Sequence, residues 1–239
     1  QIPHHSCQKE LAPAMGSAMC DDDRIRKMTF TGSTEVGRIL MRQSANTLKK
    51  MSLELGGNAP LIVFDDADMD IAIAGAMASK YRNAGQTCVC ANRMFVQDGI
   101  YDEFARRLAE TSAAMKVGSG FEEGVEQGPI IDDQGFAKVE RHVADAIAKG
   151  AKLQTGGKPH ARGGTFYEPT VLTDMSSDMQ MFTEETFGPV AGLFRFSSDD
   201  EAVAMANDTE FGLAAYIFTN NTSRLFRVSE ALEYGLSLI

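Results

Sequence analysis

Apolar and polar residues follow two different periods along this chain, and together they predict strands that alternate with helices. Short apolar or alternating runs predict strands at 26–30, 50–55, 59–64, 93–97, 188–196 and 213–219. Apolar residues near helical spacing predict helices at 34–46, 65–82, 101–116, 137–152, 197–208 and 221–232. This alternation indicates a mostly parallel α/β sheet, and such sheets bind ligands at the carboxyl ends of their strands.

Residues that favour helix ends sharpen several of these boundaries. Ser33 is well placed as the N-cap of the 34–46 helix, and a cluster of aspartates opens the 65–82 helix. Gly150 is expected to cap the 137–152 helix at its C-terminus. The final apolar run, 234–239, predicts a last strand.

The composition narrows the class of protein. The 239 residues are 44% hydrophobic and 23% charged, as in a soluble globular protein with a sizeable core. The formal net charge of −10, without a long basic run, disfavours nucleic acids and anionic membranes as partners. No apolar run approaches the roughly 20 residues that span a bilayer. The N-terminal segment lacks the basic and apolar regions of a signal peptide.

The cysteines, at positions 7, 20, 88 and 90, do not form the dense framework of a disulfide-rich protein. They favour a reducing compartment and predict a cytoplasmic protein. One residue separates Cys88 from Cys90, which is too close for the usual cysteine spacing of a zinc site, and the histidines offer no matching pair. His4 and His5 lie near Cys7, but this terminal arrangement is a weak signal, so we predict no metal site.

Two short motifs have residues suited to a nucleotide. In FTGSTEVG, Gly32 lets the backbone approach a ligand, and Ser33 begins a helix whose free N–H groups suit a phosphate. The alternative is a simple turn between strand and helix. In EETFGPV, a carboxylate of Glu184 or Glu185 could hold a ribose diol while the ring of Phe187 packs on a cofactor. The alternative there is a charged loop before a strand.

Two other motifs have residues suited to covalent and acid–base chemistry. Glu54, in LELGGN, lies beside apolar residues and flexible glycines and could act as a general base, or it could be a solvated residue before a turn. Cys88, in GQTC, follows a predicted helix and precedes a predicted strand, where backbone N–H groups could stabilise a thiolate. The alternative is an inert buried thiol, since free cysteine is among the most buried residue types.

The order and spacing of these four motifs resemble the aldehyde dehydrogenase superfamily. The resemblance runs from about Arg26 to about Gly235, and residues 1–20 are not expected to match well. It implies an aldehyde dehydrogenase-like α/β fold: the remnant of a Rossmann-type cofactor domain and a parallel-sheet α/β catalytic domain. The expected division is a partial dinucleotide-binding domain at 1–56 and a catalytic thiol domain, incomplete at its C-terminus, at 57–239.

The resemblance also implies an activity and residue roles. Cys88 matches the nucleophile and Glu54 the general base of an NAD- or NADP-dependent oxidation, in which an aldehyde becomes a carboxylate through a thiohemiacetal and a thioester. The residues that match cofactor contacts are Gly32 and Ser33 at the pyrophosphate, Leu55 at the nicotinamide, and Glu185 and Phe187 at the nicotinamide ribose and ring.

Residues 52–70 and 81–93 most resemble the succinate-semialdehyde dehydrogenase branch of this superfamily. That branch has an arginine for the distal carboxylate of the substrate at the position of Arg82, and a planar guanidinium suits a carboxylate. The alternative is a surface arginine. The implied substrate is a small aldehyde, succinate semialdehyde or the related glutarate semialdehyde. The implied assembly is a homo-oligomer of the full-length protein, without nucleic acid or membrane.

The resemblance further implies that parts of the family fold precede and follow these residues, including an oxyanion-hole asparagine upstream and an oligomerisation strand downstream. Either these residues are a piece of a longer chain or the protein is truncated, and a truncated protein is expected not to turn over an aldehyde. Two other functions stay open: a non-catalytic structural or interaction module, and a cofactor-independent esterase that uses Cys88 and Glu54.

Cys90 has no implied role in the reaction. Its closeness to Cys88 in the sequence suggests that oxidation could join the two sulfurs and switch the enzyme off reversibly. The short separation would strain such a disulfide, so the loop would have to move.

Overall fold

The computed structural model describes the backbone of residues 5–238 and the side chains of residues 11–238. The chain divides into two compact units, Gln1–Gly56 and Gly57–Ile239. The predicted roles of the two units, cofactor binding for the first and catalysis for the second, remain predictions.

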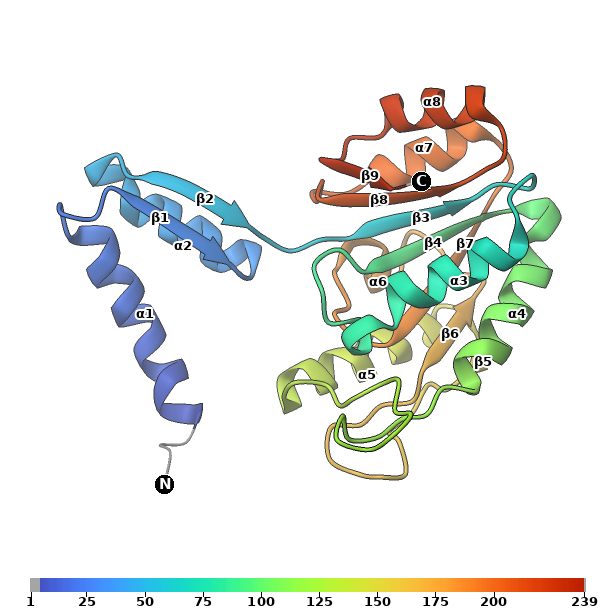
Figure 1. Cartoon of the computed structure of the whole chain (residues 1–239), viewed down its shortest axis with the longest axis horizontal. Helices are drawn as coiled ribbons and strands as arrows, with labels where there is room; N and C mark the ends of the chain where they lie inside the picture. Colours follow the sequence, from blue (N-terminus) through green and yellow to red (C-terminus); the bar gives the residue numbers. More distant parts are fainter. Residues whose placement is uncertain (1–4, 239) are drawn as a thin grey trace. The chain divides into compact units, whose positions relative to one another are not determined.

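The first unit has two helices and a two-stranded parallel sheet (Figure 1). Its elements are α1 (His5–Asp21), β1 (Lys27–Thr31), α2 (Thr34–Ser44), the 3-10 helix η1 (Ala45–Thr47) and β2 (Lys50–Glu54). Ser33 is the N-cap of α2, as predicted, because its Oγ accepts a hydrogen bond from the Val36 N–H at 3.3 Å. The small core contains Cys20, Met28 and Leu40.

Helix α1 is not predicted from the sequence, although the alanines and methionines of this segment favour a helix. Pro13 lies inside it, where proline removes a backbone N–H and usually breaks a helix. The apolar residues of α1 also form no clear stripe, so the helical period is weak.

The second unit contains a seven-stranded sheet in the order β5-β6-β7-β4-β3-β8-β9 (Figure 1). The strands are β3 (Ala59–Val63), β4 (Ala91–Gln97), β5 (Lys152–Thr155), β6 (Thr170–Thr173), β7 (Val190–Phe196), β8 (Ala214–Phe218) and β9 (Leu236–Leu238). All neighbours pair in parallel except β5 with β6. The predicted mostly parallel α/β sheet is therefore confirmed, and so is the last strand.

Helices cover both faces of this sheet. They are α3 (Met69–Lys80), α4 (Tyr101–Ala113), α5 (Asp133–Ala148), α6 (Gln180–Thr183), α7 (Asp199–Asn207) and α8 (Thr222–Ala231), with 3-10 helices η2 (Arg82–Gly85) and η3 (Asp98–Ile100). On β3, Leu61 and Val63 belong to the core shared with α3 and α4, while Ile62, like Phe64 just after the strand, belongs to the core on the other face. Burial of both faces explains why β3 reads as one continuous apolar run.

The helix predicted at 137–152 is wrong at both ends. α5 begins earlier, at Asp133, because the Asp132 side chain accepts from the Gly135 N–H at 2.9 Å and caps it. The C-cap is Lys149, not Gly150, and Gly150 follows it with a φ of 103°. Lys152 already begins β5, an edge strand whose polar residues give no apolar signal.

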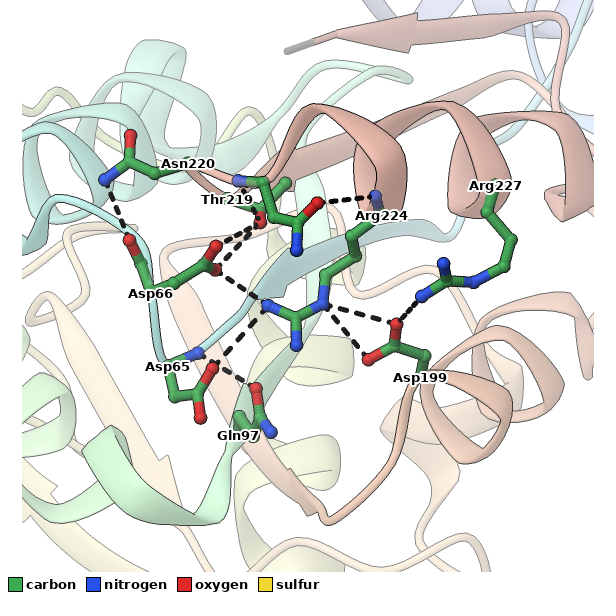
Figure 2. A network of polar contacts seen from close by, with 9 residues as sticks. Asp65, Asp66, Gln97, Asp199, Thr219, Asn220, Arg224 and Arg227 are labelled. Carbon is green, nitrogen blue, oxygen red and sulfur yellow. Dashed lines mark hydrogen bonds and ion pairs between the residues drawn. The ribbon is translucent and has the colours of Figure 1, made fainter.

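The carboxyl ends of β3 and β8 are joined by a polar network centred on Arg224 of α8 (Figure 2). Its guanidinium lies 2.9 Å from Asp66 and 3.2 Å from Asp199, and it sits over the ring of Phe64 at 4.6 Å. Thr219 donates to the Asp66 carboxylate at 2.8 Å. Ion pairs thus fasten α7 and α8 to this edge of the sheet.

Candidate active site

The Cys88 loop connects α3 to β4 through backbone in the left-handed region. Asn83, Ala84 and Gly85 have φ values of 52°, 55° and 74°. Such a conformation costs free energy for residues other than glycine, and it concentrates at functional sites. The loop therefore has a conformation that its own sequence would not choose, and surrounding contacts must hold it.

Gln86 supplies several of these contacts. Its side-chain Nε2 donates to the Asn83 and Pro129 carbonyls at 3.1 and 3.2 Å, and its Oε1 accepts from the Ile131 N–H at 2.8 Å. The loop is thereby fastened to the segment that precedes α5. Gln86 belongs to the GQTC motif, and the structure gives it this anchoring role.

Cys88 itself is half-buried and carries a free thiol. A residue of β8 holds the backbone just after Cys88, because the Tyr216 hydroxyl donates to the Val89 carbonyl at 2.6 Å. Sequence reasoning missed Tyr216; its only signal is a hydroxyl in the otherwise apolar strand run LAAYIF. Burial raises the pKa of Tyr216, and the positive charge of Arg82 opposes this rise. The Arg82 side chain is exposed.

Gly57 lies between the Cys88 loop and Glu185. Its N–H donates to Glu185 Oε1 at 3.0 Å, and a Cβ built on it would lie 2.0 Å from the Cys88 carbonyl oxygen. Burial raises the pKa of Glu185, while the Gly57 N–H and the charges of Lys138 and Lys80 oppose the rise. The structure thus brings Cys88 and Glu185 to one glycine.

The segment that carries Phe187 also packs against the Cys88 loop. Phe187 has a φ of 54° and a partly exposed ring. A Cβ on Gly85 would lie 2.1 Å from the Gly188 carbonyl oxygen, so the two backbones are in contact. This contact accounts for glycine at position 85, whereas a Cβ on Gly188 would lie 2.3 Å from the Val139 side chain.

The candidate residues of this unit lie at the amino ends of three adjacent strands. Gly57 precedes β3, Cys88 precedes β4, and Glu185 and Phe187 precede β7. The candidate residues therefore lie at the edge of the sheet opposite the carboxyl ends, where the sequence predicts ligand binding. The carboxyl ends of β3 and β8 hold the Arg224 network, whereas close-packed glycines bring the amino-end loops together.

Lys80 and Cys90 lie beneath these loops. The Lys80 side chain is only 1% exposed, and burial lowers its pKa to about 8, against the influence of Cys90 and Glu185. Cys90 is buried, with its Sγ 2.8 Å from Thr87 Oγ1. Lys80 is another residue that sequence reasoning missed, and its signal is a cation at the end of an apolar helix.

In the first unit, the other predicted residues meet where β1 and β2 end. The Gly32 N–H donates to the Glu54 carbonyl at 3.0 Å. The Leu55 side chain packs on α2 so closely that a Cβ on Gly37 would lie 2.6 Å from it. The Glu54 side chain is exposed. Beside them, α1, β1 and α2 line an apolar groove of about 720 Å³.

Neither a metal centre nor a membrane span is found in the described part of the chain. Residues 5–238 contain no group of three or more His, Cys, Asp or Glu placed to hold a metal ion. His4 and the side chains of His5 and Cys7 lie outside the described residues. No helix within 5–238 is long and apolar enough to cross a membrane.

These features define an α/β protein with a cysteine at the amino edge of a mostly parallel sheet and a separate unit in which a glycine turn leads into an N-capped helix. The sequence profile of the Aldehyde dehydrogenase family matches residues 10–239, and the chain belongs to this family. Because the match begins before Arg26, the expectation that the first 20 residues match poorly is wrong from residue 10 onwards.

Curated relatives carry several substrate names. The chain is 57% identical to succinate-semialdehyde dehydrogenase (NADP(+)) of Escherichia coli strain K12, covering 94% of this chain and 47% of that protein. It is 58% identical to 3-sulfolactaldehyde dehydrogenase of Pseudomonas putida, with 94% and 46% covered. It is 56% identical to glutarate-semialdehyde dehydrogenase of Pseudomonas aeruginosa, with 94% and 47% covered.

Solved structures show the same fold. Succinate-semialdehyde dehydrogenase from Burkholderia pseudomallei superposes with a TM-score of 0.94 at 58% identity, covering 95% of this chain and 47% of that one. The chain thus spans about half the length of the relatives it matches.

Proposed function

We propose that these residues form part of an NAD- or NADP-dependent aldehyde dehydrogenase that oxidises a small aldehyde to its carboxylate. The observation that carries this proposal is the convergence of Cys88 and Glu185 on Gly57, within a chain of this family. A nucleophile beside a carboxylate suited to a ribose is the arrangement that such a reaction needs.

Cys88 and Glu54 perform the covalent steps of this proposal. The Cys88 thiolate adds to the aldehyde carbon, a C–S bond forms, and the carbonyl oxygen becomes the alkoxide of a thiohemiacetal. NAD or NADP, when bound, supplies the hydride acceptor of the oxidation. Glu54 takes a proton from water, which attacks the resulting thioester, releases the Cys88 thiolate and yields the carboxylate.

The residues present suit such a dinucleotide. The α2 N-terminus at Ser33 offers N–H groups to the pyrophosphate, Gly32 lets the backbone come close to it, and the adjacent apolar groove suits a flat adenine ring. Leu55, Glu185 and Phe187 would hold the nicotinamide end. The relatives include proteins named for NADP, and the choice between NAD and NADP is open to measurement.

For the substrate we propose succinate semialdehyde, with Arg82 as the residue that binds its distal carboxylate. Arg82 is exposed in η2, six positions before Cys88 in the sequence. Three relatives are named for aldehydes with an anionic group, a carboxylate in two and a sulfonate in one. A guanidinium can pair with either group.

We also propose that the full-length protein is a cytoplasmic homo-oligomer. The free thiols of Cys20, Cys88 and Cys90 suit a reducing compartment. Size-exclusion chromatography with light scattering would measure the assembly, and a monomeric mass would contradict this part of the proposal.

One assay set on the full-length protein tests the function. Cofactor reduction is measured with succinate semialdehyde, glutarate semialdehyde and uncharged butanal, and ester hydrolysis is measured without cofactor. We expect dehydrogenation that Cys88→Ser abolishes, and a preference for the anionic aldehydes that Arg82→Gln removes. Ester cleavage alone would indicate an esterase, and no activity would indicate a non-catalytic module.

A further inference from the structure

Residues 184–186 present different side chains to opposite sides of an extended segment. Glu184 has extended backbone, with φ −107° and ψ 138°. In such backbone, successive side chains point to opposite sides. Glu184 and Thr186 both contact His142 of α5, whereas the Glu185 carboxylate contacts the Gly57 N–H. Whatever fixes Glu184 and Thr186 therefore also directs Glu185.

The His142 ring is fully buried, with both nitrogens in use. Nε2 lies 3.0 Å from Glu184 Oε2, and Nδ1 lies 3.1 Å from Thr186 Oγ1. Burial lowers the pKa of His142, so the ring is neutral at neutral pH. Because an ionised carboxylate only accepts, these partners assign the proton to Nε2, which donates to Glu184, while Nδ1 accepts from the Thr186 hydroxyl.

Asn92 of β4 holds the backbone of the same segment. Its Oδ1 accepts from the Thr186 N–H at 3.1 Å, and its Nδ2 donates to the Glu184 carbonyl at 3.0 Å. Nδ2 also lies 2.6 Å from Asn58 Oδ1, next to Gly57. Asn92 thus fixes the path of the backbone, and His142 fixes the side chains on one of its faces.

We propose that His142 is a positioning residue for Glu185. By holding Glu184 and Thr186 on one side, it directs the Glu185 carboxylate to Gly57, and thereby to the ribose of a bound dinucleotide. The last step rests on the proposed function, whereas the orientation of Glu185 does not. Nothing in the sequence near EETFGPV indicates His142, which lies on another element.

Four variants of the full-length protein separate the contacts. His142→Gln keeps a donor near the Nε2 position, His142→Asn keeps an acceptor near Nδ1, and His142→Phe removes both. Thr186→Val removes only the hydroxyl partner. Thr183→Val is the matched control, because Thr183 is exposed in the preceding helix α6.

The first readout is independent of any cofactor: amide hydrogen exchange of Gly57, whose N–H bonds to Glu185. We expect exchange to rise about tenfold in His142→Phe and by a smaller factor in Thr186→Val, His142→Asn and His142→Gln. The buried Phe95 amide in β4 should stay protected, and Thr183→Val should match wild type.

The second readout is the Kd of NADH and NADPH, measured by fluorescence without turnover. It should rise about tenfold in His142→Phe. The alkylation rate of Cys88 by iodoacetamide should change less than about twofold, because the Cys88 loop makes none of the His142 contacts named above.

Two results would overturn the inference. The first is unchanged Gly57 exchange in His142→Phe with Phe95 still protected. The second applies if His142→Phe unfolds, because Thr186→Val then becomes the deciding variant. A Gly57 exchange rate in Thr186→Val equal to that of wild type would refute the role of His142. A wild-type protein that binds neither dinucleotide would refute the proposed function instead, and the exchange measurement would still test the orientation of Glu185.

Discussion

The backbone of Gly57 lies against the carbonyl group of Cys88, and a Cβ at position 57 would sit 2.0 Å from that oxygen. No side chain fits such a gap, since real Cβ contacts are longer by an ångström or more. The close approach also places the Gly57 N–H at Glu185. One residue without a side chain thus sets the separation between the proposed nucleophile and the proposed ribose ligand.

Gly57→Ala should therefore displace Cys88 while leaving the fold largely intact. A displacement of about 1 Å can cost on the order of a hundredfold in rate, so we expect a loss of this size in turnover of the full-length enzyme. The matched control is Gly128→Ala, because a Cβ there would meet nothing within 4 Å. Equal turnover in the two variants would show that the close approach is not needed.

Local patterns made part of this site predictable. Ser33 could be recognised because an N-cap depends on neighbouring residues alone, and the structure confirms it. The placement of Cys88 between a helix and a strand is confirmed for the same reason, since α3 and β4 have strong apolar patterns of their own.

The residues that hold the site in place were not predictable in this way. His142, Asn92 and Tyr216 come from α5, β4 and β8, and their contacts to the site depend on the sheet order. Each looks like an ordinary helix or strand residue in the sequence. The gathering of Gly57, Cys88 and Glu185 at the amino ends of β3, β4 and β7 likewise depends on the sheet order, which no local pattern reports.

Arg93 is expected to be the most costly arginine to replace in the second unit. Its fully buried guanidinium donates to the Asn58, Met205 and Ala206 carbonyls at distances from 2.8 to 3.3 Å, and to the Tyr234 hydroxyl at 3.0 Å. Arg93→Met would leave these groups without a donor. Because each unsatisfied buried group costs about 1–3 kcal/mol, we expect the free energy of unfolding in urea to fall by at least about 3 kcal/mol.

The control for Arg93 is Arg106→Met. Arg106 pairs with Glu110 at 2.8 Å on the exposed face of α4. Exposed pairs of this kind contribute roughly 0.3–0.5 kcal/mol, so this variant should unfold almost like wild type. Similar losses in both variants would contradict a special role for the buried guanidinium.

Lys80 should make the free energy of unfolding depend on pH at alkaline pH. Burial lowers its pKa from 10.5 to about 8 in the folded protein. Between these pH values the unfolded chain binds the proton and the folded protein does not, so the free energy of unfolding increases as pH rises. The shift corresponds to about 3 kcal/mol, gained as pH rises from about 8 towards 10.5 and absent below that window.

Urea unfolding at a series of pH values measures this dependence. Lys80→Met should be more stable than wild type at neutral pH, and the difference should shrink as pH rises through the window. Lys158→Met is the control, since Lys158 is exposed and should show a constant difference. If the Lys80→Met difference were also constant, the buried lysine would not titrate as stated.

Cys90 provides a test of reversible oxidation. Its Sγ is buried and lies 2.8 Å from Thr87 Oγ1, so it must leave this contact to reach Cys88. The strained backbone at Asn83 and Ala84 offers a place where the loop can relax.

We expect peroxide to inactivate the full-length wild type and dithiothreitol to restore it, because a Cys88–Cys90 disulfide protects Cys88 from irreversible oxidation. Cys90→Ala should be inactivated without full recovery, and Cys20→Ala, which removes a buried thiol of the first unit, should recover like wild type. Full recovery of Cys90→Ala would show that the Cys90 thiol contributes only to packing.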